Sequence, residues 1–198
     1  MIKILLIIIA YFLGSFPTGY VLGKIFYRKD IREYGSGNIG MSNVFRTFGP
    51  IPAFITLIGD AIKGYFPVWF AFYLNLSADW ISYIAISAIL GHVFSIYLKF
   101  KGGKGIATTF GVIFAINYLI GLCSVIVWIV TLILSRYFSL SSLVATFSSI
   151  IFSLFLKIDI RYTYLFISIF ILSLITHREN IKRLINGNER KFGQKVKL

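Results

Sequence analysis

A short polar segment, residues 100–109 with the sequence FKGGKGIATT, lies between two long apolar runs and carries the side chains best suited to chemistry. Its three glycines let backbone N–H groups turn towards one point, and its two lysines add positive charge. A helix that begins at Ile106 would point its dipole at the same place. The segment differs from a nucleotide-binding P-loop, because Lys104 is followed by a glycine and then by an apolar residue. It therefore predicts an anion site, and a basic loop that only sets membrane orientation is the alternative.

A second glycine-rich segment, residues 35–46 with the sequence GSGNIGMSNVFR, has a similar character. Its glycines allow close approach of the backbone, and Ser36, Asn38 and Asn43 offer hydrogen bonds. Arg46 adds a forked donor that suits a phosphate. The segment predicts a second group of anion ligands, with a glycine-rich turn that leads into a helix as the alternative.

Two weaker polar groups follow. Ser141 and Ser142 begin a predicted helix, where a serine pair usually serves only as a cap. Residues 176–187, THRENIKRLING, place His177 and Asn180 on one helix face if the helix continues beyond the membrane. This segment predicts either further phosphate ligands or a basic helix that lies on anionic lipid headgroups.

The surrounding sequence is that of an integral membrane protein. Of its 198 residues, 58% are hydrophobic, and the mean hydropathy is +0.84. Crossing about 30 Å of hydrocarbon takes roughly 20 helical residues, and several apolar runs reach that length. We expect one all-α transmembrane domain over residues 1–198. The single cysteine, Cys123, excludes an intramolecular disulfide and a cysteine-cluster metal site.

The apolar runs and their interruptions predict seven transmembrane helices. The first has a bend or break near Pro17. The run from 106 to 136 is split near Asn117 to Gly121, because one helix of that length would extend about 46 Å. The predicted spans are residues 1–23, 51–74, 80–99, two within 106–136, 142–156 and 162–177. A polar loop over 24–50 and a basic tail over 178–198 complete the chain.

The distribution of charge orients these spans. Sixteen of the 20 lysines and arginines fall on the side that holds the 24–50 loop, the 99–105 loop, the 136–142 link and the tail. The other side has only Lys3, Lys157 and Arg161. By the positive-inside rule the N-terminus is outside, the C-terminus is cytoplasmic, and every polar motif lies on the cytoplasmic face. The net charge of +13 thus reflects topology, anionic lipid and an anionic substrate, and the sequence has no recognisable nucleic-acid-binding module.

Two features deep inside predicted spans involve ionisable residues, namely the pair Asp60 and Lys63, and His92. Asp60 and Lys63, at positions i and i+3, can pair on one helix face, since an isolated charge at that depth is costly. The sequence leaves open whether this pair is structural or handles protons or substrate. It also leaves open whether His92 serves packing or catalysis. The chain has only seven acidic residues, too few and too scattered for a two-metal phosphotransferase. Arg, Lys, Ser, Asn and backbone N–H groups instead suit phosphate recognition without a metal or other cofactor.

Several segments carry a resemblance to a known family. They are GSFPTGY at 14–20, GSGNIG at 35–40 with Asn43 and Arg46, GDAIKG at 59–64, GH at 91–92 followed by FKGGKGIAT at 100–108, and HRENI at 177–181 with Arg183, Gly187 and Glu189. Together and in this order they resemble the PlsY family, the bacterial acyl-phosphate:glycerol-3-phosphate acyltransferases. One departure is Ser95-Ile96, where family members often have a proline. The resemblance covers nearly the whole chain and implies seven spans in the bacterial inner membrane with a cytoplasmic active site.

The resemblance implies a reaction and a set of residues. The family moves a fatty acyl group from acyl phosphate to the 1-hydroxyl of glycerol 3-phosphate and releases lysophosphatidic acid and phosphate. Catalytic roles are implied for Ser36, Arg46, Lys104, His177 and Asn180. Substrate-binding roles are implied for Asn38, Gly40, Asn43, Gly102, Gly103, Gly105, Thr108, Ser142 and Glu189. For the glycines of the 102–105 loop we expect backbone amides that face a phosphate, and His177 is expected to orient or polarise a reacting group.

We expect direct transfer without an acyl-enzyme, because an acyl phosphate is already activated and the leaving phosphate can accept the hydroxyl proton. We expect a monomer with no cofactor. An organic-phosphate transporter is the alternative function, although no inverted repeat is evident in the sequence. A lipid-binding scaffold would leave both glycine-rich motifs unexplained.

Overall fold

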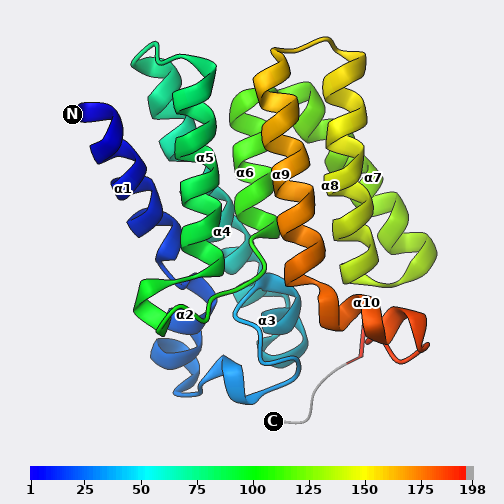
Figure 1. Ribbon diagram of the computed structural model, residues 1–198. Helices are drawn as coiled ribbons and strands as arrows, with labels where there is room; N and C mark the ends of the chain where they lie inside the picture. Colours follow the sequence, from blue (N-terminus) through cyan, green and yellow to red (C-terminus); the bar gives the residue numbers. More distant parts are fainter. Residues whose placement is uncertain (195–198) are drawn as a thin grey trace.

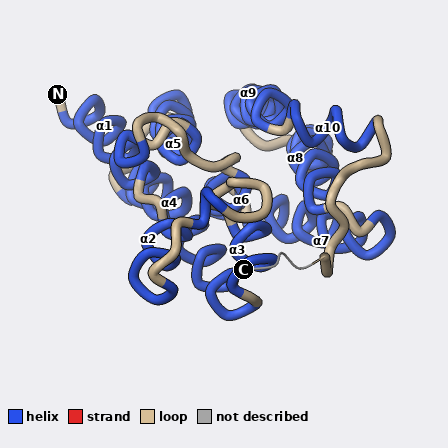
Figure 2. Tube along the Cα trace, turned by 90° about the horizontal axis from the view of Figure 1, so that it is seen from below, coloured by secondary structure: helices blue, strands red, loops and turns tan. Residues whose placement is uncertain are grey.

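The computed structural model describes residues 1–194, and within that range it contains helices and no strand (Figure 1). The helices are α1 Ile2–Ser15, α2 Thr18–Tyr27, η1 Ile31–Glu33, α3 Met41–Phe48, α4 Pro50–Tyr73, α5 Ala78–Val93, η2 Ile96–Leu98, α6 Ile106–Ile116, α7 Tyr118–Ser135, α8 Phe138–Phe155, α9 Ile160–Thr176 and α10 Arg178–Ile185. Figure 2 shows α6 between a group formed by α1, α4 and α5 and a group formed by α7, α8 and α9. The all-α prediction is confirmed.

Five helices in the described chain are long and apolar enough to cross a membrane, and the first of them joins α1 to α2. A sixth is possible if α9 and α10 form one span, although they meet at an angle of 64°. The remaining apolar helix, α6, is shorter. Large apolar side chains point outwards, as Ile133 does with 71% of its surface exposed, and such faces suit contact with lipid. The protein is a multi-pass membrane protein.

The first span is broken where proline predicts it. α1 ends at Ser15, Pro17 precedes α2, and the Phe16 carbonyl between them accepts the Thr18 amide at 3.2 Å in a tight turn. Lys63 of α4 supplies a second donor, with its Nζ 2.6 Å from that carbonyl oxygen. The same Nζ lies 2.9 Å from Asp60 Oδ1, so the predicted ion pair forms. The break is therefore held by a buried lysine whose charge is balanced on its own helix.

Small residues set how closely α4 and α6 approach. A Cβ added at Gly64 would overlap the backbone of Thr108, and one added at Gly111 would overlap the backbone of Ala61. Close approach through small residues is a common way to pack helices in membranes, where no hydrophobic effect drives one helix onto another. The contact fixes α6, and with it the glycine-rich loop that precedes α6.

Of two predicted helix boundaries in the second half of the chain, one agrees with the structure and one does not. The split between α6 and α7 lies at Asn117, whose side-chain oxygen accepts a hydrogen bond from the Ile120 amide at 3.1 Å, as expected near this position. The predicted start of the next span at 142 is wrong, because α8 begins at Phe138. Ser141 and Ser142 donate their hydroxyl protons to carbonyls four residues earlier, so both lie inside the helix rather than ahead of it.

Candidate functional site

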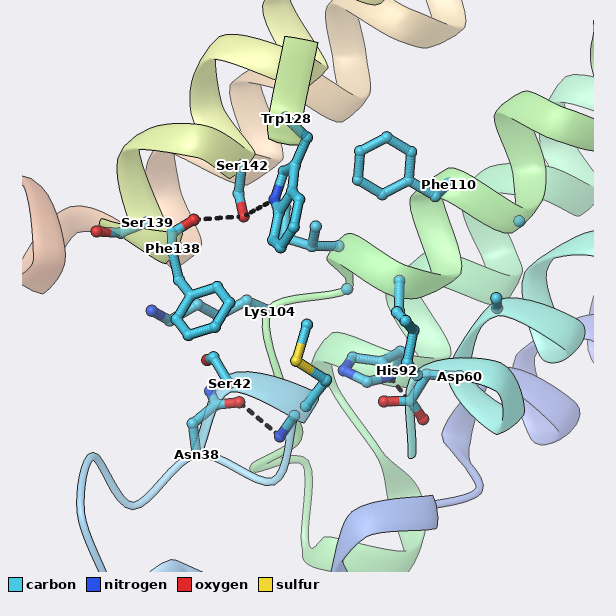
Figure 3. A pocket seen from close by; sticks show the side chains of 18 of the residues that line it. Asn38, Ser42, Asp60, His92, Lys104, Phe110, Trp128, Phe138, Ser139 and Ser142 are labelled. Atoms are coloured by element: carbon cyan, nitrogen blue, oxygen red, sulfur yellow. Dashed lines mark hydrogen bonds and ion pairs between the residues drawn. The ribbon is translucent and has the colours of Figure 1, made fainter. Parts of the chain in front are cut away.

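A cavity of about 630 Å³ opens among the helices on the side of the bundle where α3 and α10 lie. Its polar lining comes from the loop before α3, the loop before α6, the start of α8, and α10 with the segment after it. Its apolar lining comes from α4, α6 and α7 and includes Ile62, Tyr65, Phe110, Phe114 and Ile129. In Figure 3, Lys104, Ser139 and Asn38 lie towards one end of this cavity, and Phe110 and His92 lie towards the other. One cavity thus combines a cationic, hydrogen-bonding part with an apolar wall.

Ten of the fourteen predicted site residues line this cavity. They are Ser36, Asn38, Gly40, Arg46, Lys104, Gly105, Ser142, His177, Asn180 and Glu189. The other four, Asn43, Gly102, Gly103 and Thr108, do not line it. Lys101 is exposed and also lies outside the lining, so only Lys104 of the two loop lysines reaches the cavity.

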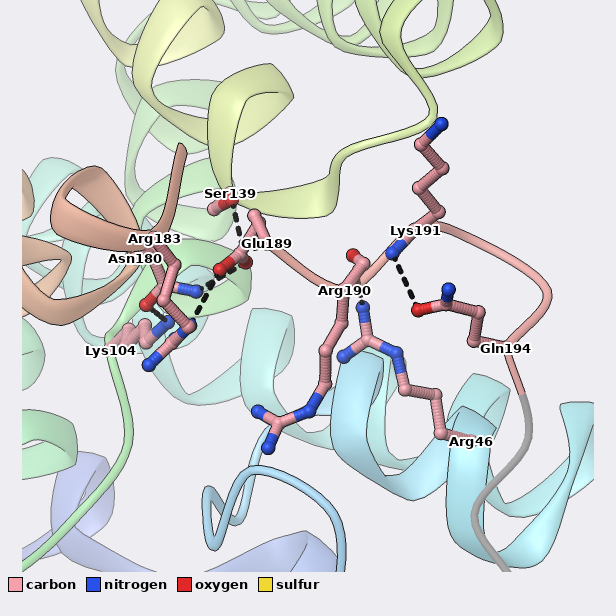
Figure 4. Close-up of polar contacts among 9 residues, drawn as sticks. All are labelled: Arg46, Lys104, Ser139, Asn180, Arg183, Glu189, Arg190, Lys191 and Gln194. Atoms are coloured by element: carbon pink, nitrogen blue, oxygen red, sulfur yellow. Dashed lines mark hydrogen bonds and ion pairs between the residues drawn. The ribbon is translucent and has the colours of Figure 1, made fainter. Parts of the chain in front are cut away.

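Lys104 belongs to a chain of hydrogen bonds that joins three elements (Figure 4). Its Nζ donates to Asn180 Oδ1 of α10. Asn180 Nδ2 in turn donates to Glu189 Oε1 at 2.6 Å. Glu189 also accepts from Ser139 Oγ at 2.9 Å and from Arg183 Nε at 2.8 Å. Because a carboxylate can only accept, Glu189 fixes the Asn180 amide so that its oxygen faces Lys104.

The charge states of this chain follow from burial and neighbours. Burial lowers the pKa of Lys104 to about 8, an effect that Glu189 opposes and nearby arginines reinforce. Burial also disfavours the charged form of Glu189, but the hydrogen bonds from its three donors outweigh it and lower the pKa of that carboxyl. Lys104 is consequently a cation close to its titration range, paired through an amide with a firmly ionised carboxylate.

Arg46 is held beside this chain with unused donors. Its Nη2 donates to the Arg190 carbonyl at 3.2 Å, and its guanidinium lies 5.4 Å from the ring centre of Phe138. Its Nε is buried and has no partner among the described residues. Burial lowers the pKa of Arg46, and Glu189 acts against that effect. A buried guanidinium with a free N–H is well placed to bind an anion.

Ser142 and His177 are each engaged by local contacts. Ser142 Oγ donates to the Phe138 carbonyl at 2.8 Å and accepts from Trp128 Nε1 at 3.3 Å. His177 Nδ1 donates to the Ser173 carbonyl at 2.9 Å, which leaves Nε2 as the available ring nitrogen. α10 does not continue the line of α9 as the shared-face prediction assumed, because the chain bends by 64° at His177. The bend nevertheless keeps His177 and Asn180 on the same cavity.

Asn43 shapes the first motif from within. Its oxygen accepts from the Ser36 amide at 2.9 Å. Its Nδ2 donates to three carbonyls of the loop, those of Ile31, Tyr34 and Asn38. All its capacity as a donor is therefore used inside the protein, and the side chain is fully buried. Asn43 holds the loop that presents Ser36 and Asn38, instead of meeting a ligand itself.

The glycine-rich loop differs from the expectation in the use of its amides. The Gly102 amide donates to the Val93 carbonyl and the Gly103 amide donates to the His92 carbonyl, both at 3.0 Å. These two N–H groups cap the end of α5 and are not available to a phosphate. Gly105 has φ of 78°, a left-handed conformation that favours glycine, and it starts α6. Lys104 and the start of α6 are thus the parts of the predicted anion site that this loop still offers.

Several cavity residues were not among those predicted. Ser139 belongs to the Glu189 network, Arg190 and Trp128 line the cavity, and Asp60 and His92 form part of its wall. Asp60 and His92 stand out in the sequence as ionisable residues inside spans, whereas nothing local distinguishes Trp128 from other aromatic residues of the chain. Among residues 1–194 no three His, Cys, Asp or Glu side chains are grouped as metal ligands. The cavity offers cations, hydroxyls and amides, which suit phosphate groups.

Comparison with known proteins gives a consistent result. Residues 4–187 match the family model described as glycerol-3-phosphate acyltransferase. The chain is 47% identical over 184 residues to the glycerol-3-phosphate acyltransferase of Pelagibacter ubique, covering 92% of this chain and 93% of the relative. It is 43% identical over 184 residues to glycerol-3-phosphate acyltransferase 2 of Thermotoga maritima, covering 93% of each.

Two solved structures have the same fold. Both are crystal structures of PlsY (YgiH), an integral membrane glycerol 3-phosphate acyltransferase. The glycerol 3-phosphate form superimposes with a TM-score of 0.93 at 35% identity, covering 98% of this chain and 96% of that chain. The lysophosphatidic acid form gives a TM-score of 0.90 at 34% identity, covering 98% and 97%.

Proposed function

The chain belongs to the glycerol-3-phosphate acyltransferase family and is a membrane acyltransferase, and from this premise we propose that its acyl donor is an acyl phosphate. The enzyme then transfers the acyl group to the 1-hydroxyl of glycerol 3-phosphate and releases lysophosphatidic acid and inorganic phosphate. The alternative of an organic-phosphate transporter is wrong, since the relatives are named as acyltransferases and the two similar solved structures are described as the glycerol 3-phosphate form and the lysophosphatidic acid form of such an enzyme.

The observation that supports this donor is the dual nature of the cavity. Lys104 and Arg46 supply positive charge on one part of its lining, and apolar side chains such as Phe110 and Phe114 form another part. An acyl phosphate has the same two parts, a phosphate and an apolar chain. Glycerol 3-phosphate brings a second phosphate but no chain. We assign the cations to the two phosphates and the apolar wall to the acyl chain.

The residues of the cavity are sufficient for direct transfer. The hydroxyl oxygen of glycerol 3-phosphate attacks the acyl carbon, the bond from that carbon to the phosphate oxygen breaks, and the leaving phosphate accepts the hydroxyl proton. Lys104 and Arg46 offset the charge on the phosphates, and Asn180 and Ser36 orient them. His177 polarises a reacting group through Nε2. Ser142 is not a nucleophile in this scheme, because its hydroxyl proton is already donated to Phe138.

Seven spans complete the proposal for the whole chain, residues 1–198 as a single domain. α1 with α2, α4, α5, α7 and α8 cross the bacterial inner membrane as full spans, and α6 and α9 complete the seven. The N-terminus is outside and the catalytic cavity faces the cytoplasm. Fourteen basic residues of the described chain belong to the cytoplasmic segments, and Lys195 and Lys197 of the predicted tail lie outside the described residues. The enzyme works as a monomer.

Acyl transfer by the purified protein in detergent tests the proposal. Labelled glycerol 3-phosphate is followed into lysophosphatidic acid with palmitoyl phosphate or palmitoyl-CoA as donor and without added metal. We expect product from palmitoyl phosphate only, with Lys104→Met inactive and still folded. Lys101→Met is the matched control, because this exposed lysine of the same loop does not line the cavity. Equal use of palmitoyl-CoA would remove the donor-phosphate assignment, and a stable acyl group on Ser36 or Ser142 would contradict direct transfer.

A further inference from the structure

His92 lies where the end of α5 meets the glycine-rich loop. Its carbonyl accepts the Gly103 amide at 3.0 Å. Its ring fills the space beside Gly103, since a Cβ added there would overlap the ring nitrogen Nε2 and lie 3.1 Å from two ring carbons. The side chain is 3% exposed and lines the cavity, but it makes no hydrogen bond to Lys104, Asn180 or Glu189. His92 therefore contacts the backbone that carries Lys104 and not the Lys104 network itself.

A buried polar chain extends from His92 to the break in the first span. Asp60 Oδ1 lies 3.9 Å from His92 Nδ1 and 2.9 Å from Lys63 Nζ, and that Nζ donates to the Phe16 carbonyl. Figure 3 shows Asp60 and His92 facing each other across the wall of the cavity. The contact between Asp60 and His92 is longer than a hydrogen bond, and His92 Nδ1 has no other partner within residues 1–194. The ring is thus held in place by packing, with the Asp60 carboxylate beside Nδ1.

The end of α5 is clamped to α1 by two more contacts. Ser95 Oγ donates to the Ser15 carbonyl at 2.5 Å, and Tyr11 Oη donates to the Phe94 carbonyl at 2.6 Å. Ser95 therefore links α5 to α1. It belongs to the Ser95-Ile96 segment, where the resemblance would lead one to expect a proline. The His92 carbonyl, and the loop that bonds to it, are consequently fixed relative to the broken first span.

We propose that His92 is a positioning residue for the anion site: with Asp60 behind it, its ring and carbonyl set the course of the 102–105 loop and so the place of the Lys104 ammonium group. The proposal rests on the assignment of Lys104 to phosphate binding in the proposed function. It also gives the Asp60–Lys63 pair a part in the site, because Asp60 lies beside the ring that supports the loop.

Binding of inorganic phosphate, measured by calorimetry on the purified full-length protein, tests this without turnover. His92→Ala and Gly103→Ala should each weaken phosphate binding about tenfold or more, since a hydrogen bond to a charged group contributes about 1.5–3 kcal/mol and a displaced ammonium group would lose it. The first removes the support of the loop, and the second forces a Cβ against the ring. The combined variant should bind phosphate about as weakly as either single variant, because removing the ring makes room for the new Cβ.

Two controls separate positioning from stability. Ser87→Ala removes a buried bond from the same helix, that of Ser87 Oγ to the Ile7 carbonyl at 2.7 Å, and should lower the melting temperature without changing phosphate affinity. His92→Asn, which keeps a polar atom near the position of Nδ1, should restore part of the affinity and serves if His92→Ala does not fold. Unchanged phosphate affinity in a folded His92 variant, or single effects that multiply in the combined variant, would overturn the inference. Absence of acyl transfer in a parent protein that binds phosphate would instead count against the proposed function.

Discussion

At the scale of single residues, the site divides its polar groups into those that can meet an anion and those that hold them. Lys104 and Arg46 line the cavity, and each makes one side-chain hydrogen bond within the described chain, whereas Glu189 carries a negative charge that would repel a phosphate. Three donors already occupy Glu189. Its place in the site follows from the orientation it imposes on Asn180, since an amide without a fixed acceptor can present either its oxygen or its nitrogen.

Glu189→Gln tests this positioning role. A glutamine side chain offers one acceptor oxygen and two donors, so Asn180 can turn its nitrogen towards Lys104 and lose the bond to it. Hydrogen bonds to charged groups contribute about 1.5–3 kcal/mol, and we expect kcat/KM for glycerol 3-phosphate to fall roughly tenfold or more. Glu179→Gln is the matched control, because within residues 1–194 this exposed glutamate of α10 forms an ion pair with Arg178 alone, at 3.7 Å. Equal kinetics for the two variants would contradict the role of Glu189.

The titration of Lys104 predicts a dependence of substrate binding on pH. In the free protein burial lowers the pKa of Lys104 to about 8. A bound phosphate dianion favours the protonated amine and raises that pKa, so affinity is fully present below about pH 8 and falls as the pH rises through it. KM for glycerol 3-phosphate, measured from about pH 7, where the phosphate is already largely a dianion, should therefore increase above about pH 8.

Lys104→Arg is the control for that pH profile. A guanidinium stays charged throughout this range, so the rise of KM near pH 8 should disappear even if binding is weaker overall. A rise that persists in the arginine variant would assign the titration to another group. A flat profile in the parent protein would show that Lys104 keeps its charge in the free enzyme.

At the scale of elements, the segment after α10 is the part that closes the site. Residues 186–194, here called the strap, bring Glu189 and the Arg190 carbonyl against the residues that they hold. Phe192 anchors the strap: its ring is stacked on Phe45 at 5.3 Å and meets Phe138 edge-on at 5.4 Å. Its amide donates to the Arg136 carbonyl at 2.6 Å. The strap thereby connects α3, α8 and the Lys104 network.

Phe192→Ala should loosen the strap without unfolding the bundle. Each aromatic pair contributes about 0.5–1.5 kcal/mol, so loss of both pairs should raise KM for glycerol 3-phosphate roughly fivefold or more by freeing Glu189. Steady-state kinetics and a melting curve measure the two effects separately. Phe155→Ala, at an 81% exposed position at the far end of α8, is the control and should leave KM unchanged. A lower melting temperature with unchanged KM would mean that the strap is structural only.

The helices could be predicted from the sequence where their length and apolar character follow from crossing a lipid bilayer. The apolar runs identified the spans, and Pro17 and Asn117 marked real breaks, because each acts on its own stretch of backbone. The start of α8 was predicted wrongly because serine is found both at the N-cap of a helix and inside a helix, where its hydroxyl donates to a carbonyl of the preceding turn. Only the tertiary structure shows which of the two applies.

The site was predictable as a set of residues but not as a set of contacts. The sequence motifs identified Arg46, Lys104 and Asn180, and all three line one cavity. It did not show that the Gly102 and Gly103 amides cap α5, or that Asn43 holds its own loop. Each of these groups has several chemically equivalent partners in the sequence, and packing selects one. The same limit applies to His92, whose partner lies on a different helix.

At the scale of the whole molecule, the cavity and most of the basic residues share one side of the bundle. The loop before α6 and the helices α3 and α10 lie at the same end in Figure 1, and the N-terminus lies at the opposite end. Such an arrangement agrees with substrates that carry phosphate and reach the enzyme from the cytoplasm. It also makes the number of crossings testable, since an odd number separates the N-terminus from α10 by the membrane.

Cysteine labelling in a Cys123→Ala background, which removes the native thiol, tests whether the two ends of the bundle lie on opposite sides of the membrane. Ser77→Cys places a thiol in the exposed turn before α5, and Asn186→Cys places one at the exposed end of α10. In spheroplasts of the expressing bacterium, a membrane-impermeant maleimide should label position 77 at once and position 186 only after permeabilisation. Acyl transfer by each variant is the control for folding. Labelling of both positions from outside would place the cavity on the outer face, and then neither the positive-inside argument nor a cytoplasmic source for the substrates could hold.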